Sequence, residues 1–203
     1  MTRAHEPACG TLYSIGHSNH PLETFLQLLK AHAIEVLADV RSQPYSRYAP
    51  QFNQEALRRA VTQAGLRYLY LGKELGGRPA QQEFYDATGH VLYAKVAQSE
   101  AFQQGLRQLA EACQRYRVAI MCSEENPAQC HRYLLIGRAL GERAITLHHI
   151  RGDGRIQTSA EVEREAGHQP VLPGFEEYRW RSTRSVSPRK PRRSSSAPSD
   201  VPE

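Results

Sequence analysis

The chain has 203 residues, of which 40% are hydrophobic and 23% charged, ordinary values for a soluble globular protein. No stretch approaches the ~20 apolar residues that a membrane-spanning helix needs, so we expect no membrane partner. The formal net charge is +5, but six basic and two acidic residues lie from Arg181 onward, and the remaining 20 basic and 19 acidic residues give only +1. The charge therefore gives little reason to expect that the folded part binds nucleic acid.

Composition also predicts the compartment and the domain boundaries. The N-terminus lacks the apolar stretch of a secretory signal, and four cysteines are too few for a secreted disulfide scaffold, so we expect a cytoplasmic protein. Residues 181–203 are rich in Ser, Pro and Arg and have almost nothing to bury, which predicts a disordered basic tail. We expect a flexible N-terminus over residues 1–10 and one domain over residues 11–180. The oligomeric state is not predicted.

Short apolar runs alternate with helical patterns along the domain. The predicted strands are residues 12–15, 34–40, 66–71, 118–122 and 144–147, and the predicted helices begin at Pro21, Asn53, Ser99, Cys130 and Ser159. Proline suits the first helical turn, and Asn and Ser are good N-caps. Strands that alternate with helices predict an α/β fold, a single domain with a mainly parallel sheet and helices on both faces.

Polar side chains collect where the predicted strands end, and ligands of open α/β sheets bind beyond the carboxyl ends of the strands. These candidate residues are His17 and Ser18 after the first strand, Asp39 and Arg41 after the second, Arg78 in a glycine-rich loop after the third, Cys122 and Glu124 after the fourth, and Cys130, His131 and Arg132 at the next helix start. The sequence therefore predicts one polar pocket at this edge.

The Cys130-His131-Arg132 tripeptide is predicted to begin a helix, where unpaired backbone N–H groups attract anions. Arg132 could bind a phosphate or carboxylate through two N–H groups, and the pKa of Cys130 could be lowered beside His131 and Arg132. The alternative is that Cys130 only fills space and that Arg132 forms a structural ion pair.

His17 follows a glycine at a strand end and could act as a general acid or base. Asp39 could orient His17 or Arg41, or Asp39 and Arg41 could form an internal ion pair that only shapes the loop. Arg41 and Arg78 are candidate anion-binding residues, with Ser18 and Glu124 as further substrate contacts.

A metal site is the minority interpretation of the cysteines. Cys122, Cys130, His131 and His17 could supply four ligands to zinc, but the C-x7-C-H spacing is not a usual zinc pattern. A disulfide between Cys122 and Cys130 is a further option, and packing of Cys122 at a strand end is the favoured one. The phosphate-binding G-x-x-x-x-G-K-[ST] and dinucleotide-binding G-x-G-x-x-G motifs are absent. We therefore expect no metal and no cofactor.

Four blocks of the sequence resemble the domain-of-unknown-function family 488. They are Tyr13-Ser14-Ile15-Gly16-His17-Ser18, Asp39-Val40-Arg41 with Pro44 and Ser46, Leu71-Gly72-x-x-Leu75-Gly76-Gly77-Arg78, and Met121-Cys122-Ser123-Glu124 with Pro127 and Cys130-His131-Arg132. They occur in the family's order over about residues 11–150. The resemblance implies an α/β fold and a shared polar site at these positions, and little about activity.

These observations lead to three hypotheses. In the first, the protein is an enzyme acting on a phosphate-bearing or other anionic substrate, such as a nucleotide or nucleic acid; His17, Asp39, Cys130 and His131 would be catalytic. In the second, it is a non-catalytic module that binds a small molecule or nucleic acid, with the basic tail adding affinity. In the third, Cys122 and Cys130 serve thiol redox chemistry or bind a metal.

Overall fold

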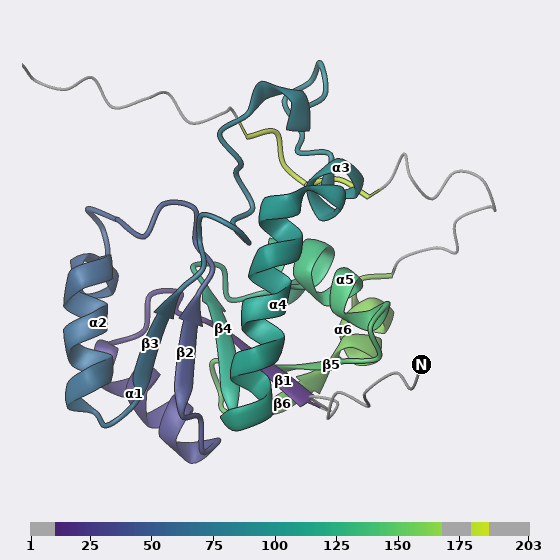
Figure 1. The fold of residues 1–203 in the computed structure, drawn as a ribbon. Helices are drawn as coiled ribbons and strands as arrows, with labels where there is room; N and C mark the ends of the chain where they lie inside the picture. The colour runs from purple at the N-terminus through teal and green to yellow at the C-terminus, as the bar shows by residue number, and fades with distance from the viewer. Residues whose placement is uncertain (1–10, 168–179, 187–203) are drawn as a thin grey trace, which may run out of the picture.

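A computed structural model of the chain describes residues 11–167 and 180–186 (Figure 1). Its six-stranded sheet has the order β3-β2-β4-β1-β5-β6. The strands are β1 (Thr11–Gly16), β2 (Val36–Asp39), β3 (Arg67–Tyr70), β4 (Val118–Cys122), β5 (Thr146–Ile150) and β6 (Ile156–Thr158). All neighbours pair in parallel except β5 and β6, which are antiparallel. The predicted α/β class and mainly parallel sheet are confirmed.

Helices cover both faces of this sheet. The α-helices are α1 (Leu22–Ala31), α2 (Gln54–Gln63), α3 (Tyr93–Gln98), α4 (Glu100–Arg115), α5 (Arg138–Gly141) and α6 (Ser159–Glu165). On one face α1 and α2 pack through Phe25 and Leu57, and on the other α3 and α4 pack through residues such as Phe102 and Leu106. The strands alternate between the two faces, so β4 gives Ile120 to one core and leaves Met121 for the other.

Several predicted boundaries change for identifiable reasons. The predicted helix from Cys130 is a π-helix over Arg132–Gly137 that continues into α5. Ser99 caps α4 by accepting a hydrogen bond from the backbone N–H of Phe102 at 3.3 Å, as expected. Asn53 lies at the N-cap of α2, but its side-chain oxygen accepts from the N–H of Ser46 at 2.7 Å instead. Four short 3-10 or π segments, Pro50–Phe52, Gln82–Phe84, Pro127–Gln129 and Arg132–Gly137, complete the fold.

The start of the predicted tail packs on the domain. Arg181 forms a β-bridge with Leu92, and the Ser182 hydroxyl accepts from the N–H of Val91 at 2.9 Å. Just before them, the indole N–H of Trp180 donates to the carbonyl of Leu134 at 2.6 Å. The predicted boundary at Arg181 therefore falls inside a segment that packs on the domain. This segment has little apolar content, and it is held by backbone hydrogen bonds and by Trp180. The rest of that prediction, residues 187–203, and the N-terminal residues 1–10 lie outside the described residues.

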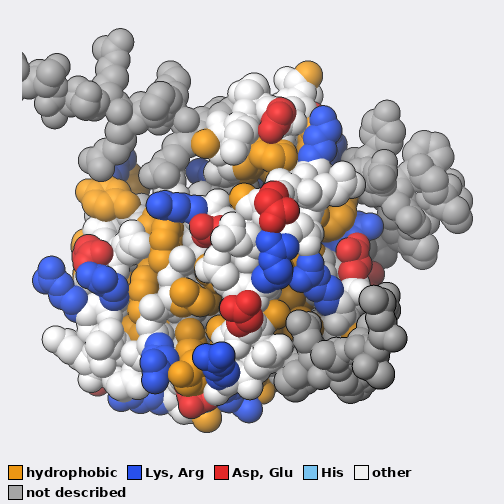
Figure 2. All heavy atoms as spheres, in the orientation of Figure 1, with side chains coloured by type: hydrophobic (Ala, Val, Ile, Leu, Met, Phe, Trp, Pro, Cys, Tyr) orange, Lys and Arg blue, Asp and Glu red, His pale blue; other side chains and the backbone are white. Residues whose placement is uncertain are grey.

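Charges of both signs are mixed on the face shown in Figure 2, consistent with the small net charge of the sequence before Arg181. Within residues 11–167 and 180–186, none of the helices has the length and apolar character required to cross a membrane.

Candidate functional site

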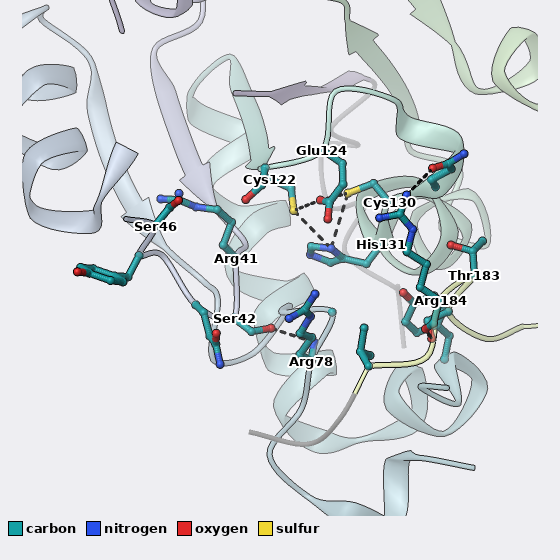
Figure 3. A pocket seen from close by; sticks show the side chains of 18 residues that line it. Arg41, Ser42, Ser46, Arg78, Cys122, Glu124, Cys130, His131, Thr183 and Arg184 are labelled. Atoms are coloured by element: carbon teal, nitrogen blue, oxygen red, sulfur yellow. Dashed lines mark hydrogen bonds between the residues drawn. The ribbon is translucent and has the colours of Figure 1, made fainter. Parts of the chain in front are cut away.

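A pocket of about 360 Å³ opens at the carboxyl ends of β2 and β4, near the centre of the sheet (Figure 3). Its lining comes from the loop after β2, the glycine-rich loop after β3, the loop after β4 and the C-terminal segment. The lining residues are Arg41, Ser42, Gln43, Tyr45, Ser46, Gly77, Arg78, Tyr93, Cys122, Ser123, Glu124, Gln129, Cys130, His131, Ser182, Thr183, Arg184 and Val186. A pocket at this edge is where an open α/β sheet binds its ligand.

Four side chains form the floor of the pocket, and we call Cys122, Glu124, Cys130 and His131 the floor cluster. The Oε2 atom of Glu124 lies 2.9 Å from the sulfur of Cys122 and 3.4 Å from that of Cys130. The Nδ1 atom of His131 lies 3.7 Å from Cys122 Sγ and 3.8 Å from Cys130 Sγ. Figure 3 shows the two sulfur atoms, the carboxylate and the imidazole pointing toward one another. Residues up to nine positions apart in the chain thus meet at one point.

The pKa values of the two floor cysteines are shifted in opposite directions. Burial opposes ionisation of Cys130, but a hydrogen bond from Cys122 and the charges of Arg132 and His131 lower its pKa well below the usual thiol range. Hydrogen bonding to Cys130, followed by burial, raises the pKa of Cys122. Burial also opposes protonation of His131, yet the adjacent Cys130 thiolate raises its pKa. The shifts of Cys130 and His131 therefore both favour a thiolate next to an imidazolium.

Both floor cysteines are free thiols, so the predicted alternative of a Cys122–Cys130 disulfide is not what the structure contains. The favoured interpretation, in which Cys122 only packs, accounts for its burial but not for its polar neighbours, since the Glu124 carboxylate and the His131 ring both reach its sulfur. Exposure is low for both sulfur-bearing residues, at 5% for Cys122 and 1% for Cys130.

Arg132 lies beneath the floor cluster rather than in the pocket, and it is 1% exposed. Its Nε donates to Cys130 Sγ at 3.3 Å and its NH1 to the hydroxyl of Ser14 at 3.3 Å. Its NH2 donates to the carbonyls of Glu124 at 2.6 Å and Glu125 at 3.2 Å. The sequence predicted that Arg132 binds a substrate anion, but its guanidinium donates its hydrogen bonds to these interior acceptors instead. Arg132 is thus placed to stabilise the Cys130 thiolate and to hold the loop after β4.

Asp39 and Arg41 form the internal ion pair that was the structural alternative for them. Arg41 donates from Nε to Asp39 Oδ1 at 2.9 Å and from NH2 to Asp39 Oδ2 at 2.6 Å. The hydroxyl of Tyr68 also donates to Asp39 Oδ2 at 2.7 Å, and Arg41 NH2 donates to the carbonyl of Phe52 at 2.8 Å. Asp39 has no exposed surface and does not line the pocket, whereas Arg41 reaches the pocket wall. Asp39 therefore orients Arg41.

His17 stands behind Arg41, outside the pocket lining. Its Nδ1 donates to the carbonyl of Ser18 at 2.8 Å, so its Nε2 is the acceptor for Arg41 NH1 at 3.3 Å. Its ring stacks on Phe52 at a centroid distance of 4.3 Å. Burial lowers the pKa of His17 from 6.5 to about 4, which keeps the ring neutral. The structure places His17 as a positioning partner of Arg41, and neither His17 nor Ser18 borders the pocket.

The walls of the pocket carry the exposed charges. Arg78 is exposed, and its backbone N–H donates to the hydroxyl of Ser42 at 2.9 Å. Arg184 lies across from it on the C-terminal segment and donates to Gln129 Oε1 at 3.2 Å. The sequence interpretation missed Thr183 and Arg184 because an Arg/Ser-rich composition resembled a free tail. The single tryptophan, Trp180, was the available signal that this segment packs.

Two close approaches need glycine. A Cβ at Gly77 would lie 2.7–2.9 Å from atoms of His131, so this glycine lets the loop after β3 press against that imidazole. A Cβ at Gly16 would lie 1.9 Å from the carbonyl oxygen of Glu124, so the end of β1 and the loop after β4 can meet only without a side chain there.

No curated protein sequence matches this chain significantly. One solved structure that the chain matches is that of the "Putative phosphatase (DUF442)" from Shewanella putrefaciens CN-32. It is 18% identical, the match covers 86% of this chain and 85% of that chain, and the TM-score is 0.38. The family described as "Domain of unknown function DUF488" matches residues 21–139, more than half of the chain, and this match includes the ends of β2 and β4 and the whole floor cluster. The chain belongs to the DUF488 family.

Proposed function

We propose that this protein is an enzyme acting on a phosphate-bearing or other anionic substrate, with a nucleotide or nucleic-acid phosphate as the favoured class. One observation carries the proposal. Three arginines, Arg41, Arg78 and Arg184, reach the pocket wall from three separate segments and line the same pocket as the ionisable floor cluster.

The arginines are suited to an anion because their charge is not fully used. Among the described residues, Arg78 and Arg184 have no carboxylate partner, and the only side-chain hydrogen bond of Arg184 goes to the neutral amide of Gln129. Arg41 uses four of its five side-chain N–H groups on Asp39, Phe52 and His17, which leaves one NH1 proton for a ligand. A planar guanidinium matches the geometry of phosphate oxygens.

Glu124 favours catalysis over simple binding. Its side chain is exposed and lines the same pocket as the arginines. A carboxylate there repels an anion and weakens binding, so it is unfavourable in a site that only binds. Beside two cysteine sulfurs and an imidazole, however, a carboxylate can accept or deliver a proton during a reaction. The floor cluster therefore fits a site where bonds are made and broken.

The size and rim of the pocket favour a nucleotide. A volume of about 360 Å³ lies within the range of small-molecule sites, roughly 300–1,000 Å³. Tyr45, 74% exposed, stands at the rim and is available to stack on a base.

The test is a thermal-shift screen of the full chain against nucleotides, nucleosides, phosphorylated metabolites and oligonucleotides. A ligand at ~100 times its dissociation constant should add roughly 2.7 kcal/mol to the free energy of unfolding. Arg78→Ala should abolish the shift. Arg58→Ala removes an exposed arginine on α2, far from the pocket lining, and should keep it. A phosphorylated hit that Arg78→Ala leaves unchanged, or a screen with no anionic hit, would contradict the proposal.

A further inference from the structure

The floor cluster has the spacing of a metal site. The sulfurs of Cys122 and Cys130 and the Nδ1 of His131 all lie within 4.8 Å of one another. The measured sulfur–nitrogen distances are 3.7 and 3.8 Å, and the sulfur–Oε2 distances to Glu124 are 2.9 and 3.4 Å. A tetrahedral zinc ion with Zn–S of ~2.3 Å and Zn–N or Zn–O of ~2.0 Å separates its ligand atoms by roughly 3.3–3.8 Å. The two sulfurs and Nδ1 are thus spaced closely enough to bind one ion, and Glu124 Oε2 lies beside both sulfurs.

The surroundings of His131 determine which ring nitrogen faces the sulfurs and can bind a metal. Its Nε2 lies 3.1 Å from the carbonyl oxygen of Val40, which can only accept, so Nε2 carries a proton and Nδ1 faces the sulfurs. Ligand histidines characteristically donate their other N–H to a carbonyl or carboxylate, which sets the ring orientation. Gly77 lies against the ring, so the imidazole cannot turn away.

The second coordination layer of the sulfurs is also present. Arg132 donates from Nε to Cys130 Sγ at 3.3 Å, a contact that stabilises a thiolate and is itself held by the carbonyls of Glu124 and Glu125. Cys122 ends β4, the central strand between β2 and β1, so its position is set by the sheet. Both cysteines are therefore held from outside the cluster, one by the sheet and one by Arg132.

The chemistry of the donor atoms also identifies the metal. Two thiolates and an imidazole select zinc over magnesium or calcium, which prefer oxygen ligands.

We infer that Cys122, Cys130 and His131 form a zinc-binding site, and that the exposed Glu124, whose Oε2 lies beside both sulfurs, is the exchangeable fourth ligand on the pocket side. Three buried ligands and one exchangeable position are the arrangement of catalytic rather than structural zinc sites. This inference goes beyond the proposed function, because it depends on the donor atoms and not on the substrate. The sequence spacing C-x7-C-H did not predict it, since the ligands are brought together by the fold.

The experiment uses the reduced full chain, stripped of metal with a chelator, and titrates it with Zn²⁺ against a chromophoric competitor and separately with Co²⁺. The wild type should bind one equivalent of each ion, and Co²⁺ should give a thiolate charge-transfer band and the intense visible bands of a tetrahedral centre. Cys122→Ser and Cys130→Ser should each lose the tight equivalent. Glu124→Gln should keep it, with weaker affinity and a changed cobalt spectrum.

Ser123→Ala is the matched control, since Ser123 is exposed in the same loop and borders the pocket but offers no ligand to the cluster. It should bind zinc like the wild type. The cobalt spectrum of the wild type decides the matter even if the cysteine variants fail to fold. A wild type with no thiolate–cobalt band, or a Cys122→Ser variant that binds zinc as tightly as the wild type, would overturn the inference. Neither result depends on whether Arg78 binds an anion, so this site and the proposed function can fail separately.

Discussion

Two buried polar clusters lie at the same edge of the sheet and differ in how far their bonding capacity is used. Behind the pocket, Asp39 and His17 have their polar atoms bonded: the carboxylate receives charged N–H groups and a phenol, and the imidazole has a partner on each nitrogen. Arg41, which they hold, reaches the pocket wall with one NH1 proton left. In the floor cluster, two sulfurs, a carboxylate and an imidazole converge with few strong donors among them.

This contrast separates support from chemistry. A buried carboxylate or imidazole whose polar atoms are all bonded has nothing left to offer a ligand, whereas the side chains of the floor cluster converge and line the pocket, where they can meet a proton, a substrate or a cation. Strand-end position alone did not distinguish the two clusters, because both follow parallel strands. We therefore expect changes behind the pocket to reduce stability and changes in its lining to reduce function.

The largest effect should come from Asp39→Ala. The guanidinium of Arg41, 4% exposed, would remain buried without its carboxylate. Losing one partner of a buried ion pair costs about 3–5 kcal/mol, so the free energy of unfolding in urea should fall by that amount. Glu55→Ala breaks the exposed pair with Arg58 and should cost less than about 1 kcal/mol. Equal losses in the two variants would mean that the Asp39 pair is not structural.

The next effect is a pH dependence due to His17. Its pKa is about 4 in the folded chain and 6.5 as a free side chain, so between these values only the unfolded state binds the proton. Stability should therefore fall as the pH drops from about 6.5 to about 4, by up to ~3 kcal/mol from this residue. His17→Gln should flatten that part of the profile, measured by urea unfolding at several pH values. Parallel profiles for the two proteins would contradict the assignment of a neutral, buried His17.

Gly77→Ala should have a moderate effect on stability, because Gly77 packs against His131 of the floor cluster. The new methyl group would lie 2.7–2.9 Å from atoms of His131, and forcing them apart should cost about 1–3 kcal/mol. Gly141→Ala makes the same change where no atom lies within 4 Å, and it should be neutral or slightly stabilising. Thermal unfolding compares the two. If Gly77→Ala unfolds at the same temperature as Gly141→Ala, the loop after β3 does not clamp His131.

The smallest effect on stability should come from Arg78→Ala. Its side chain is exposed and has no carboxylate partner among the described residues, so the free energy of unfolding should change by less than about 0.5 kcal/mol. Urea unfolding measures this, and the same preparation should have lost its anion-dependent thermal shift. A variant destabilised like Asp39→Ala would place Arg78 in the scaffold instead of the pocket.

The sequence predicted most of the fold because its strands and helices follow local rules. Strand β4 was placed at its observed bounds by an apolar run, and α4 by its serine cap. Strand β6 and helix α3 were not predicted, because three residues of strand and six of helix are too short to show a period. The packing of residues 180–186 was not predicted for another reason: it comes from contacts with Val91 and Leu134, which composition does not record.

The candidate site was predicted as a set of residues but not as an arrangement. Arg41, Arg78, Glu124, Cys130 and His131 do line one pocket, as strand-end reasoning suggested. Which arginine faces the ligand depends on what surrounds each guanidinium. Arg132 donates its hydrogen bonds to two carbonyls, a cysteine sulfur and a hydroxyl, and sequence spacing cannot reveal these partners. The same holds for the metal-ligand spacing of the floor cluster, which exists only after β4 and the turn before the π-helix have packed.

The most direct test of the central claim is to incubate the anionic ligand found by thermal shift with the full wild-type chain, with and without added zinc, and to analyse the recovered small molecule by mass spectrometry. The account predicts that the ligand is converted, and that Arg78→Ala leaves it unchanged. A ligand that binds in an Arg78-dependent way and is recovered intact under both conditions would contradict the enzyme proposal and identify the pocket as a binding module.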